Sequence, residues 1–305
     1  MATPRFRTEF DPRHGEAVEV APGLRRVTAN NPSPFTFHGT NSYILGAGRE
    51  VAVIDPGPDH DDHLEALLRA IGGRTVSHII VTHTHVDHSP LTARLKAETG
   101  AQTFAEGPHR PARPLHEGET NVLDASGDMD FQPDVRLTDG DLIEGDGWRL
   151  KSVFTPGHTT NHMAFAWEGT DHLISGDHVM AWATSIVAPP DGSMADYMLS
   201  LDRIRREPQT VYHPGHGGRL ENARAFVRAL KAHRLMREAA VLEQVRMGHD
   251  TIPEMVADIY ATTDKRLHGA AGLSVMAHLE DLCARGQVET DGPPTLDARY
   301  RLAGG

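Results

Sequence analysis

The sequence predicts a mixed α/β (α+β) fold with helices outside the sheets, followed by a small C-terminal domain. Apolar, strand-like runs alternate with helical ones through the first two thirds of the 305-residue chain. Several of these runs end in a short loop that carries histidine or aspartate, and such loops are where α/β folds place their sites. After residue 218 the pattern changes to long helical stretches without loops of this kind. We therefore expect a catalytic domain over residues 1–220, a connecting helix over 221–248 and a small domain over 249–305.

The elements of the first domain follow in order along the chain. Strands are expected at 50–54, 76–81 and 101–105, with helices between them at 62–71 and 90–98, the second closed by Gly100. Residues 106–134 contain much proline, glycine and charge, which predicts a long loop bordering the site. Short strands with tight turns follow to residue 167, and Gly145-Asp146-Gly147 indicates a hairpin.

The C-terminal region has the order helix, helix, β-ribbon, which is the order of a winged helix. Residues 252–260 and 273–284 carry apolar side chains at spacings of three and four, and 286–290 and 300–302 read as paired strands. The second helix has no arginine or lysine over 271–280, so a packing role is at least as well supported as entry into a nucleic-acid groove. The connecting helix carries a basic stripe that can either track phosphates or face solvent, formed by Arg224, Arg228, Lys231, Arg234 and Arg237.

Composition excludes several classes of protein. A formal charge of −12 argues against holding nucleic acid by bulk electrostatics. The single cysteine, Cys283, excludes an internal disulfide framework and fits a reducing compartment. No apolar run approaches the roughly 20 residues of a membrane span. We expect a cytoplasmic protein that does not enter a membrane, and the sequence gives no sign of an obligatory protein partner.

The densest cluster of chemically active side chains is the run from His83 to His88, in which His83, His85, Asp87 and His88 supply four potential metal ligands. Burying four such groups in one turn without a metal would leave polar atoms unsatisfied. Three later turns, each following an apolar stretch, add His158, Asp177 and His216.

Seven ligands are too many for one tetrahedral ion, so the donor set predicts two. Histidine nitrogen and carboxylate oxygen suit Zn²⁺, although other divalent ions are also compatible. Asp177 is the natural bridge, because it is the lone carboxylate of the later segments. We expect one ion at His83, His85 and His158, and the other at Asp87, His88 and His216. A hydroxide between two ions is a strong nucleophile, since metal binding lowers the pKa of water from about 15.7 to about 7. Hydrolysis is the reaction that suits this arrangement.

The order of these ligands resembles that of metallo-β-lactamase-fold hydrolases, which share His-x-His-x-Asp-His followed by a His, an Asp and a final His. The resemblance implies an αββα sandwich with two metals at one edge of the paired sheets. The segments 31–36 (NPSPFT) and 39–43 (GTNSY) resemble the N-terminal signature of the β-lactamase-like endoribonuclease subgroup. The C-terminal region is similar to the winged-helix extension of that subgroup.

Some positions depart from related patterns. Asp177 stands where the commonest class B β-lactamases carry cysteine, so antibiotic hydrolysis is not expected. His85 stands where flavodiiron proteins carry glutamate, which disfavours a redox iron site. Ser89-Pro90, in place of the glycines common in related enzymes, is expected to begin the next helix.

Three functions are compatible with these observations. The favoured one is a binuclear zinc phosphodiesterase that cleaves single-stranded RNA through a metal-bridging hydroxide. The alternative is a glyoxalase II-like hydrolase of thioesters or other acyl groups on a small molecule. A third is a nucleic-acid-binding regulatory module with a structural metal site, although structural zinc is usually closed by four protein ligands. In the enzyme, Asp87 holds the second ion and orients the nucleophile, His162 reaches the substrate or supports the ligands, and Asp55 orients the ligands.

Overall fold

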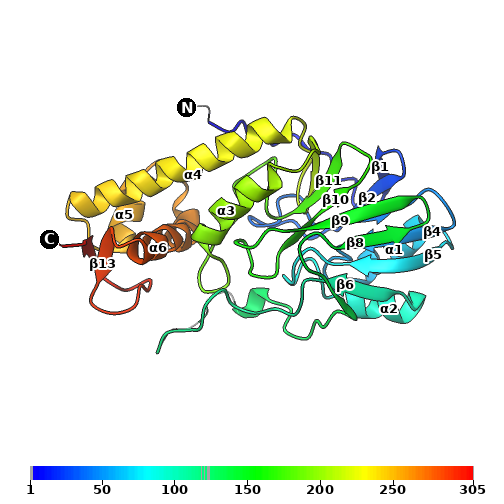
Figure 1. Ribbon diagram of the computed structural model, residues 1–305, viewed down its shortest axis with the longest axis horizontal. Coiled ribbons are helices and arrows are strands. Elements are labelled where there is room, and N and C mark those ends of the chain that lie inside the picture. Colours follow the sequence, from blue (N-terminus) through cyan, green and yellow to red (C-terminus); the bar gives the residue numbers. More distant parts are fainter. Residues whose placement is uncertain (1–2, 118, 120, 122–123, 305) are drawn as a thin grey trace.

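The computed structural model describes residues 3–117, 119, 121 and 124–304, and it places two sheets between layers of helices (Figure 1). The first sheet has the strand order β1-β2-β3-β4-β5-β6-β7 and the second has the order β12-β11-β10-β9-β8. The first comprises β1 (Ala17–Ala21), β2 (Leu24–Thr28), β3 (Asn41–Leu45), β4 (Glu50–Ile54), β5 (Thr75–Ile80), β6 (Gln102–Ala105) and β7 (Val135–Arg136). The second comprises β8 (Leu142–Gly145), β9 (Trp148–Phe154), β10 (Met163–Trp167), β11 (His172–Gly176) and β12 (Val211–Pro214).

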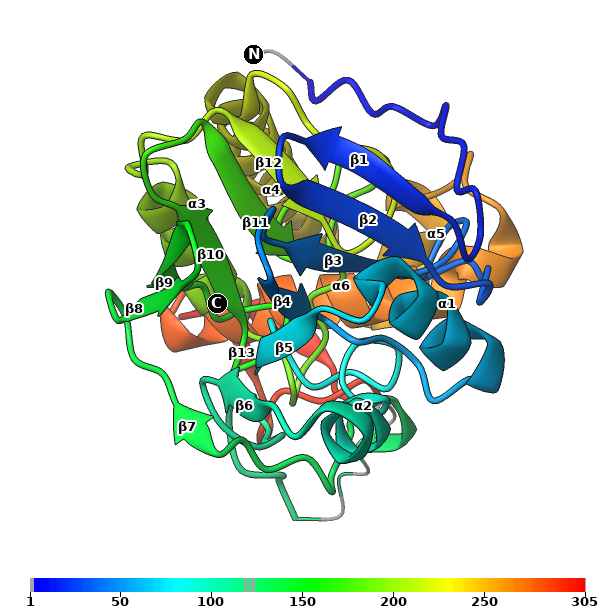
Figure 2. The same ribbon diagram turned by 90° about the vertical axis from the view of Figure 1, so that its right-hand side faces the viewer.

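The helices complete four layers. The first sheet is covered by α1 (Asp61–Ile71) and α2 (Thr92–Thr99), and the second by α3 (Met194–Ile204) and α4 (Ala223–Arg246). Figure 2 shows the two sheets side by side with helices outside them. Leu24, Tyr43, Phe165 and Ile174 are among the buried side chains that fill the space between the sheets. Each such large apolar side chain contributes about 1.5–3 kcal/mol by its burial. The αββα sandwich implied by the resemblance is confirmed.

Local chemistry explains where the elements begin and end. Helix α1 has acidic residues in its first turn and closes at Gly72 in the left-handed conformation, both of which favour its ends. The hairpin predicted around residues 145–147 joins β8 to β9, with Gly145 paired to Trp148. One expectation was wrong: Pro90 does not begin a helix. The N–H of Ser89 still donates to the His85 carbonyl, so the ligand turn continues and α2 begins only at Thr92.

The C-terminal unit has its own core and the predicted order of elements. It comprises α5 (Ile252–Ile259), α6 (His268–Ala284), and the antiparallel strands β13 (Val288–Thr290) and β14 (Tyr300–Leu302). Helix α6 is longer than predicted, and much of its length is buried between this core and α3 and α4. A short 3₁₀ turn, Lys265–Leu267, joins α5 to α6, and another, Asp124–Ser126, lies in the catalytic domain. Among the described residues, no helix has both the length and the apolar character needed to cross a membrane.

Candidate metal centre

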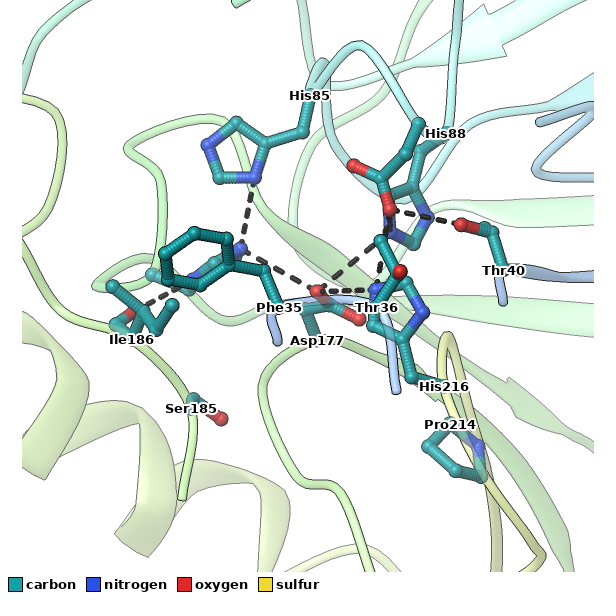
Figure 3. Close-up of polar contacts among 12 residues, drawn as sticks. Phe35, Thr36, Thr40, His85, His88, Asp177, Ser185, Ile186, Pro214 and His216 are labelled. Atoms are coloured by element: carbon teal, nitrogen blue, oxygen red, sulfur yellow. Dashed lines mark hydrogen bonds and ion pairs between the residues drawn. The ribbon is translucent and has the colours of Figure 1, made fainter. Parts of the chain in front are cut away.

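Strand ends of both sheets bring the predicted ligands together. His83, His85, Asp87 and His88 lie in the turn after β5, His158 in the loop between β9 and β10, Asp177 just after β11, and His216 just after β12. Figure 3 shows the side chains of four of them, His85, His88, Asp177 and His216, pointing toward one another from these loops. The seven residues form overlapping groups in which the ligand atoms of each group lie within 4.8 Å of one another. All seven sequence-predicted ligands therefore meet at one edge of the sandwich.

The first group, defined as His83, His85 and His158, presents three ring nitrogens to one point. His85 Nδ1 lies 3.1 Å from His83 Nε2 and 3.0 Å from His158 Nε2. Zinc–nitrogen bonds of about 2.0–2.1 Å leave neighbouring ligand atoms slightly more than 3 Å apart, so the spacing suits one tetrahedral ion. Burial and the neighbouring histidines hold the pKa of His83 well below its usual value, and burial lowers that of His85 to about 3. These rings are neutral, as metal ligation requires.

The second group, defined as Asp87, His88 and His216, combines one carboxylate with two ring nitrogens. Asp87 Oδ2 lies 3.3 Å from His88 Nε2 and 3.2 Å from His216 Nε2. Burial favours the neutral ring of His216, but the carboxylates of Asp177 and Asp87 outweigh it and raise its pKa to about 9. A divalent ion held by Asp87, His88 and His216 would take the place of the ring protons beside these carboxylates, so metal binding would release protons from the histidines.

Asp177 lies between the two groups. Its Oδ2 is 3.7 Å from His158 Nε2 in the first group, 3.7 Å from His88 Nε2 in the second, and 3.2 Å from His216 Nε2. Its other oxygen, Oδ1, is buried and has no hydrogen-bond partner among the described residues. A buried carboxylate oxygen without a partner is costly, so the residues present fit a bridging metal ligand.

Hydrogen bonds on the far side of the His158 and His216 rings direct the other nitrogen of each ring toward the centre. His158 Nδ1 donates to the Ile186 carbonyl at 2.6 Å, and His216 Nδ1 faces the Gly39 carbonyl at 3.2 Å. Because each carbonyl accepts a hydrogen bond from Nδ1, it keeps the ring proton on that nitrogen and leaves Nε2 free to bind a metal.

Asp55 lies behind ligands of both groups, which is the position that its predicted orienting role requires. Its Oδ2 accepts from His88 Nδ1 at 3.0 Å and from the Thr82 hydroxyl at 2.8 Å, while its Oδ1 accepts from the Thr82 N–H at 2.7 Å. The same hydroxyl lies 3.0 Å from His83 Nδ1 and can accept from it. One buried carboxylate thus fixes His88 directly and His83 through Thr82.

His162 lies behind the ligands and does not line the mouth of the site. It is fully buried; its Nδ1 lies 2.8 Å from the Thr155 hydroxyl, and its Nε2 accepts from the Asp177 N–H at 3.1 Å. Burial and nearby histidines hold its pKa well below the usual value, so the ring is neutral and can accept this bond. Of the two predicted roles, the structure favours support of the Asp177 backbone over contact with a substrate.

One contact to the predicted catalytic aspartate was not foreseen. The Thr40 hydroxyl donates to Asp87 Oδ2 at 2.9 Å and accepts from the Asn31 side-chain amide at 3.0 Å (Figure 3). Both residues belong to the segments that resemble the endoribonuclease signature. The only sequence signal was that resemblance, since Thr40 and Asp87 are 47 positions apart.

The basic stripe of the connecting helix is largely engaged within the protein. Four of its five cations have internal partners: the Glu207 carbonyl for Arg224, the Asp202 carboxylate for Lys231, the Ser185 carbonyl for Arg234 and the Tyr260 ring for Arg237. These internal partners support a packing role for this face more than they support a phosphate track. A single sequence could not reveal it, because the partners come from distant segments.

Comparison with known proteins identifies the class. The metallo-beta-lactamase superfamily model matches residues 35–216, and the beta-lactamase associated winged helix domain model matches residues 251–293. The chain belongs to the metallo-β-lactamase superfamily. It is a hydrolase of that superfamily with a site for divalent metal, and it carries a C-terminal winged helix.

Individual relatives resemble the chain over most of its length. It is 28% identical over 284 residues to the beta-lactamase-like protein 2 homolog of Caenorhabditis elegans, covering 90% of each protein. It is 24% identical over 297 residues to an atrochrysone carboxyl ACP thioesterase of Aspergillus novofumigatus, covering 92% of this chain and 83% of that one. A solved metallo-beta-lactamase family protein from Thermus thermophilus superposes with a TM-score of 0.75 at 26% identity, covering 93% of this chain and all of that one.

Proposed function

We propose that this chain is a binuclear zinc hydrolase whose substrates are acyl thioesters. The observation that carries the choice of substrate is that the described ligand side chains contact neither arginine nor lysine. Within the described part of the chain, none of the hydrogen bonds or ion pairs made by the seven ligand residues involves arginine or lysine. A neutral carbonyl substrate needs no such cations, whereas enzymes of phosphoryl transfer commonly use them to clamp the phosphate. The thioesterase named among the relatives supports the same chemistry.

The ligand residues would divide the work as the geometry suggests. The first group would hold one ion and the second group the other, with the Asp177 carboxylate between the two groups. Two divalent ions, when bound, supply a nucleophilic water at neutral pH and polarise the carbonyl.

Asp87 is placed to orient the attacking water. Its side chain is 22% exposed, whereas those of His88, Asp177 and His216 are nearly buried. Burial favours its neutral form, but His88 and His216 outweigh this and hold its pKa well below the usual value. The carboxylate therefore stays ionised and accepts a hydrogen bond from the water, while the Thr40 hydroxyl fixes its position.

Two exposed apolar side chains favour contact with an acyl chain. Val86 lies within the ligand turn and is 42% exposed, and Phe35, which is drawn in the close-up of the centre (Figure 3), is 55% exposed. Apolar side chains left open to water beside a reactive centre are typical of a surface that binds apolar substrate.

A second candidate is the single-stranded RNA phosphodiesterase that the sequence favoured. One observation supports it specifically: the exposed Phe35 ring belongs to the segment that resembles the endoribonuclease signature, and a base can stack on such a ring. The buried α6 and the engaged basic stripe give this candidate less support than the thioesterase. The same structural features disfavour a nucleic-acid-binding module with a structural metal.

The test compares the zinc-loaded wild type with Asp87→Ala on labelled single-stranded RNA and on a panel of acyl thioesters. We expect the wild type to hydrolyse thioesters and the variant to lose at least about 100-fold in kcat/KM, a change of about 2.7 kcal/mol in the barrier. Asp128→Asn is the matched control, because the Asp128 carboxylate accepts from the Ser89 hydroxyl beside the ligand turn rather than from a ligand ring. RNA cleavage that disappears in Asp87→Ala would establish the second candidate instead, and silence on both substrates would contradict the proposal.

Three finer features stay predictions. They are two Zn²⁺ ions per chain as the native metals, a cytoplasmic location, and function without an obligatory protein partner.

A further inference from the structure

A buried arginine on α4 lies at the junction of the catalytic sandwich and the winged helix. Arg234 is only 4% exposed, and within the described residues it has no carboxylate partner. A guanidinium removed from water without a counter-ion is expensive, so its contacts must offset a substantial desolvation cost. This arginine is not part of the proposed chemistry, and its position therefore needs another explanation.

The contacts of Arg234 come from both parts of the chain. Its guanidinium donates to the Ser185 carbonyl in the sandwich, to the Ser274 hydroxyl on α6 at 3.3 Å, and lies 5.3 Å from the centre of the Tyr197 ring on α3. The planar guanidinium of arginine holds several acceptors in fixed directions, whereas the ammonium of lysine is a compact charge on a flexible stem. Arg234 thus connects the winged helix to the segment around residue 185.

That segment supports a metal ligand. Ile186, the residue after Ser185, accepts the hydrogen bond of 2.6 Å from His158 Nδ1 (Figure 3). If the Ile186 carbonyl moved away, His158 would lose the acceptor that keeps the proton on Nδ1 and leaves Nε2 for the metal.

Tyr197 forms a second connection from Arg234 to the same ligand. The Tyr197 hydroxyl donates to the His178 carbonyl at 3.0 Å, and it also lies 3.3 Å from the Ser185 hydroxyl. Its backbone packs so closely on Gly157, the neighbour of His158, that a Cβ at position 157 would overlap it. Tyr197 and Arg234 therefore hold both the turn that carries His158 and the segment that orients its ring.

We propose that Arg234 is a positioning residue of the metal centre. By binding Ser185 and Tyr197 it keeps the Ile186 carbonyl against His158, so the docking of the winged helix through α4 and Ser274 sets the affinity of the ion at the first group. This inference rests on the proposed two-ion centre. It gives the C-terminal unit a role in metal binding that requires no nucleic acid.

The test measures zinc binding to metal-free Arg234→Met by competition with a chromophoric chelator. Residues that orient metal ligands typically contribute 10–100-fold in affinity, and we expect about a tenfold loss for one ion with the other unchanged. The visible spectrum of the cobalt-substituted variant should change at one of the two sites. Thermal stability should not fall greatly, because methionine removes a buried charge while filling similar space.

Arg237→Met is the matched control. Arg237 lies on the same helix, packs over the Tyr260 ring at 4.7 Å and donates to the Ile259 carbonyl at 3.4 Å, but its partners lie within the winged helix. The Arg237→Met variant should bind both ions with the same affinities as the wild type. If Arg234→Met fails to fold, Ser274→Ala takes its place, since it removes one contact of Arg234. This variant is expected to lower the affinity for the same ion several-fold.

Two results would overturn the inference. A folded Arg234→Met that binds both ions within twofold of the wild type would show that the arginine has only a structural role. A wild type that binds no zinc would overturn both the inference and the metal centre. Because no substrate is present in the titration, a wild type that binds two ions but hydrolyses no thioester would refute the proposed substrate and leave the role of Arg234 supported.

Discussion

Replacing Asp55 with asparagine should lower the affinity for both metal ions while leaving the shape of the side chain intact. Asp55 accepts three hydrogen bonds, from the Thr82 N–H, the Thr82 hydroxyl and His88 Nδ1. An amide has one oxygen and one NH₂ group in place of two carboxylate oxygens. Whichever way the amide is placed, its NH₂ group therefore faces a donor.

The magnitude follows from the lost contacts. A hydrogen bond to a charged group contributes about 1.5–3 kcal/mol. If the amide NH₂ faces His88, the ring gains stability by moving its proton to Nε2, the nitrogen that faces the centre. Loss of one such bond in the metal-bound state corresponds to roughly a 10–100-fold loss of affinity, the range usual for residues that orient metal ligands. The affinity at the second group should fall more than that at the first, because Asp55 contacts His88 directly but is linked to His83 only through the Thr82 hydroxyl.

The assay is a chelator-competition titration of zinc into metal-free wild type, Asp55→Asn and Asp128→Asn at neutral pH. Asp128 accepts from the Ser89 hydroxyl at 2.6 Å, so its variant loses a carboxylate near the ligand turn without touching a ligand ring. The control should bind zinc like the wild type. A folded Asp55→Asn that binds both ions with unchanged constants would refute the reasoning.

Three further substitutions test other parts of the account. Asp177→Ala should lose both ions in metal analysis, because its carboxylate lies between the groups; a variant retaining two would disprove the bridge. Gly157→Ala should lower the free energy of unfolding by about 3 kcal/mol or more, as overpacking and a left-handed φ of 134° combine; an unchanged urea midpoint would contradict this. Burial lowers the pKa of His63 to about 4, below its unfolded value of about 6.5, so its contribution to stability is complete above pH 6.5 and lost as the pH falls toward 4. The wild type should therefore lose about 3 kcal/mol more than His63→Gln between pH 7 and 4, and parallel pH curves from urea unfolding would refute this.

The metal ligands were predictable because their spacing is local and their chemistry is unusual. Four ligands lie in one turn, and each of the other three lies in the loop that follows a strand. The strands β4 and β5 could be predicted for a related reason, since each ends in consecutive apolar side chains that are buried on both faces of the sheet.

The N-terminal strands could not be predicted in the same way. Strand β2 contains Arg25 and Arg26, which interrupt the apolar pattern. Arg26 is nonetheless buried, because it lies over the Phe10 ring at 4.4 Å and donates to carbonyls of the N-terminal segment. Such compensation depends on contacts between segments that a pattern of single residues does not show.

Helix α3 was missed although its sequence contains a usable signal. Ser193 begins the helix, and its hydroxyl accepts from the Asp196 N–H, so Ser-x-x-Asp precedes an apolar run as in many helix starts. By contrast, the roles of Thr40 and Arg234 depend on partners 47 and 49 positions away, and only a three-dimensional structure could reveal them.

The central claim is that one edge of the sandwich holds two metal ions. Native mass spectrometry of the metal-free protein, reconstituted with excess zinc and then freed of unbound metal, tests it most directly. We predict two ions per chain for the wild type and fewer for Asp177→Ala. A wild type that retains one ion or none would contradict the binuclear centre.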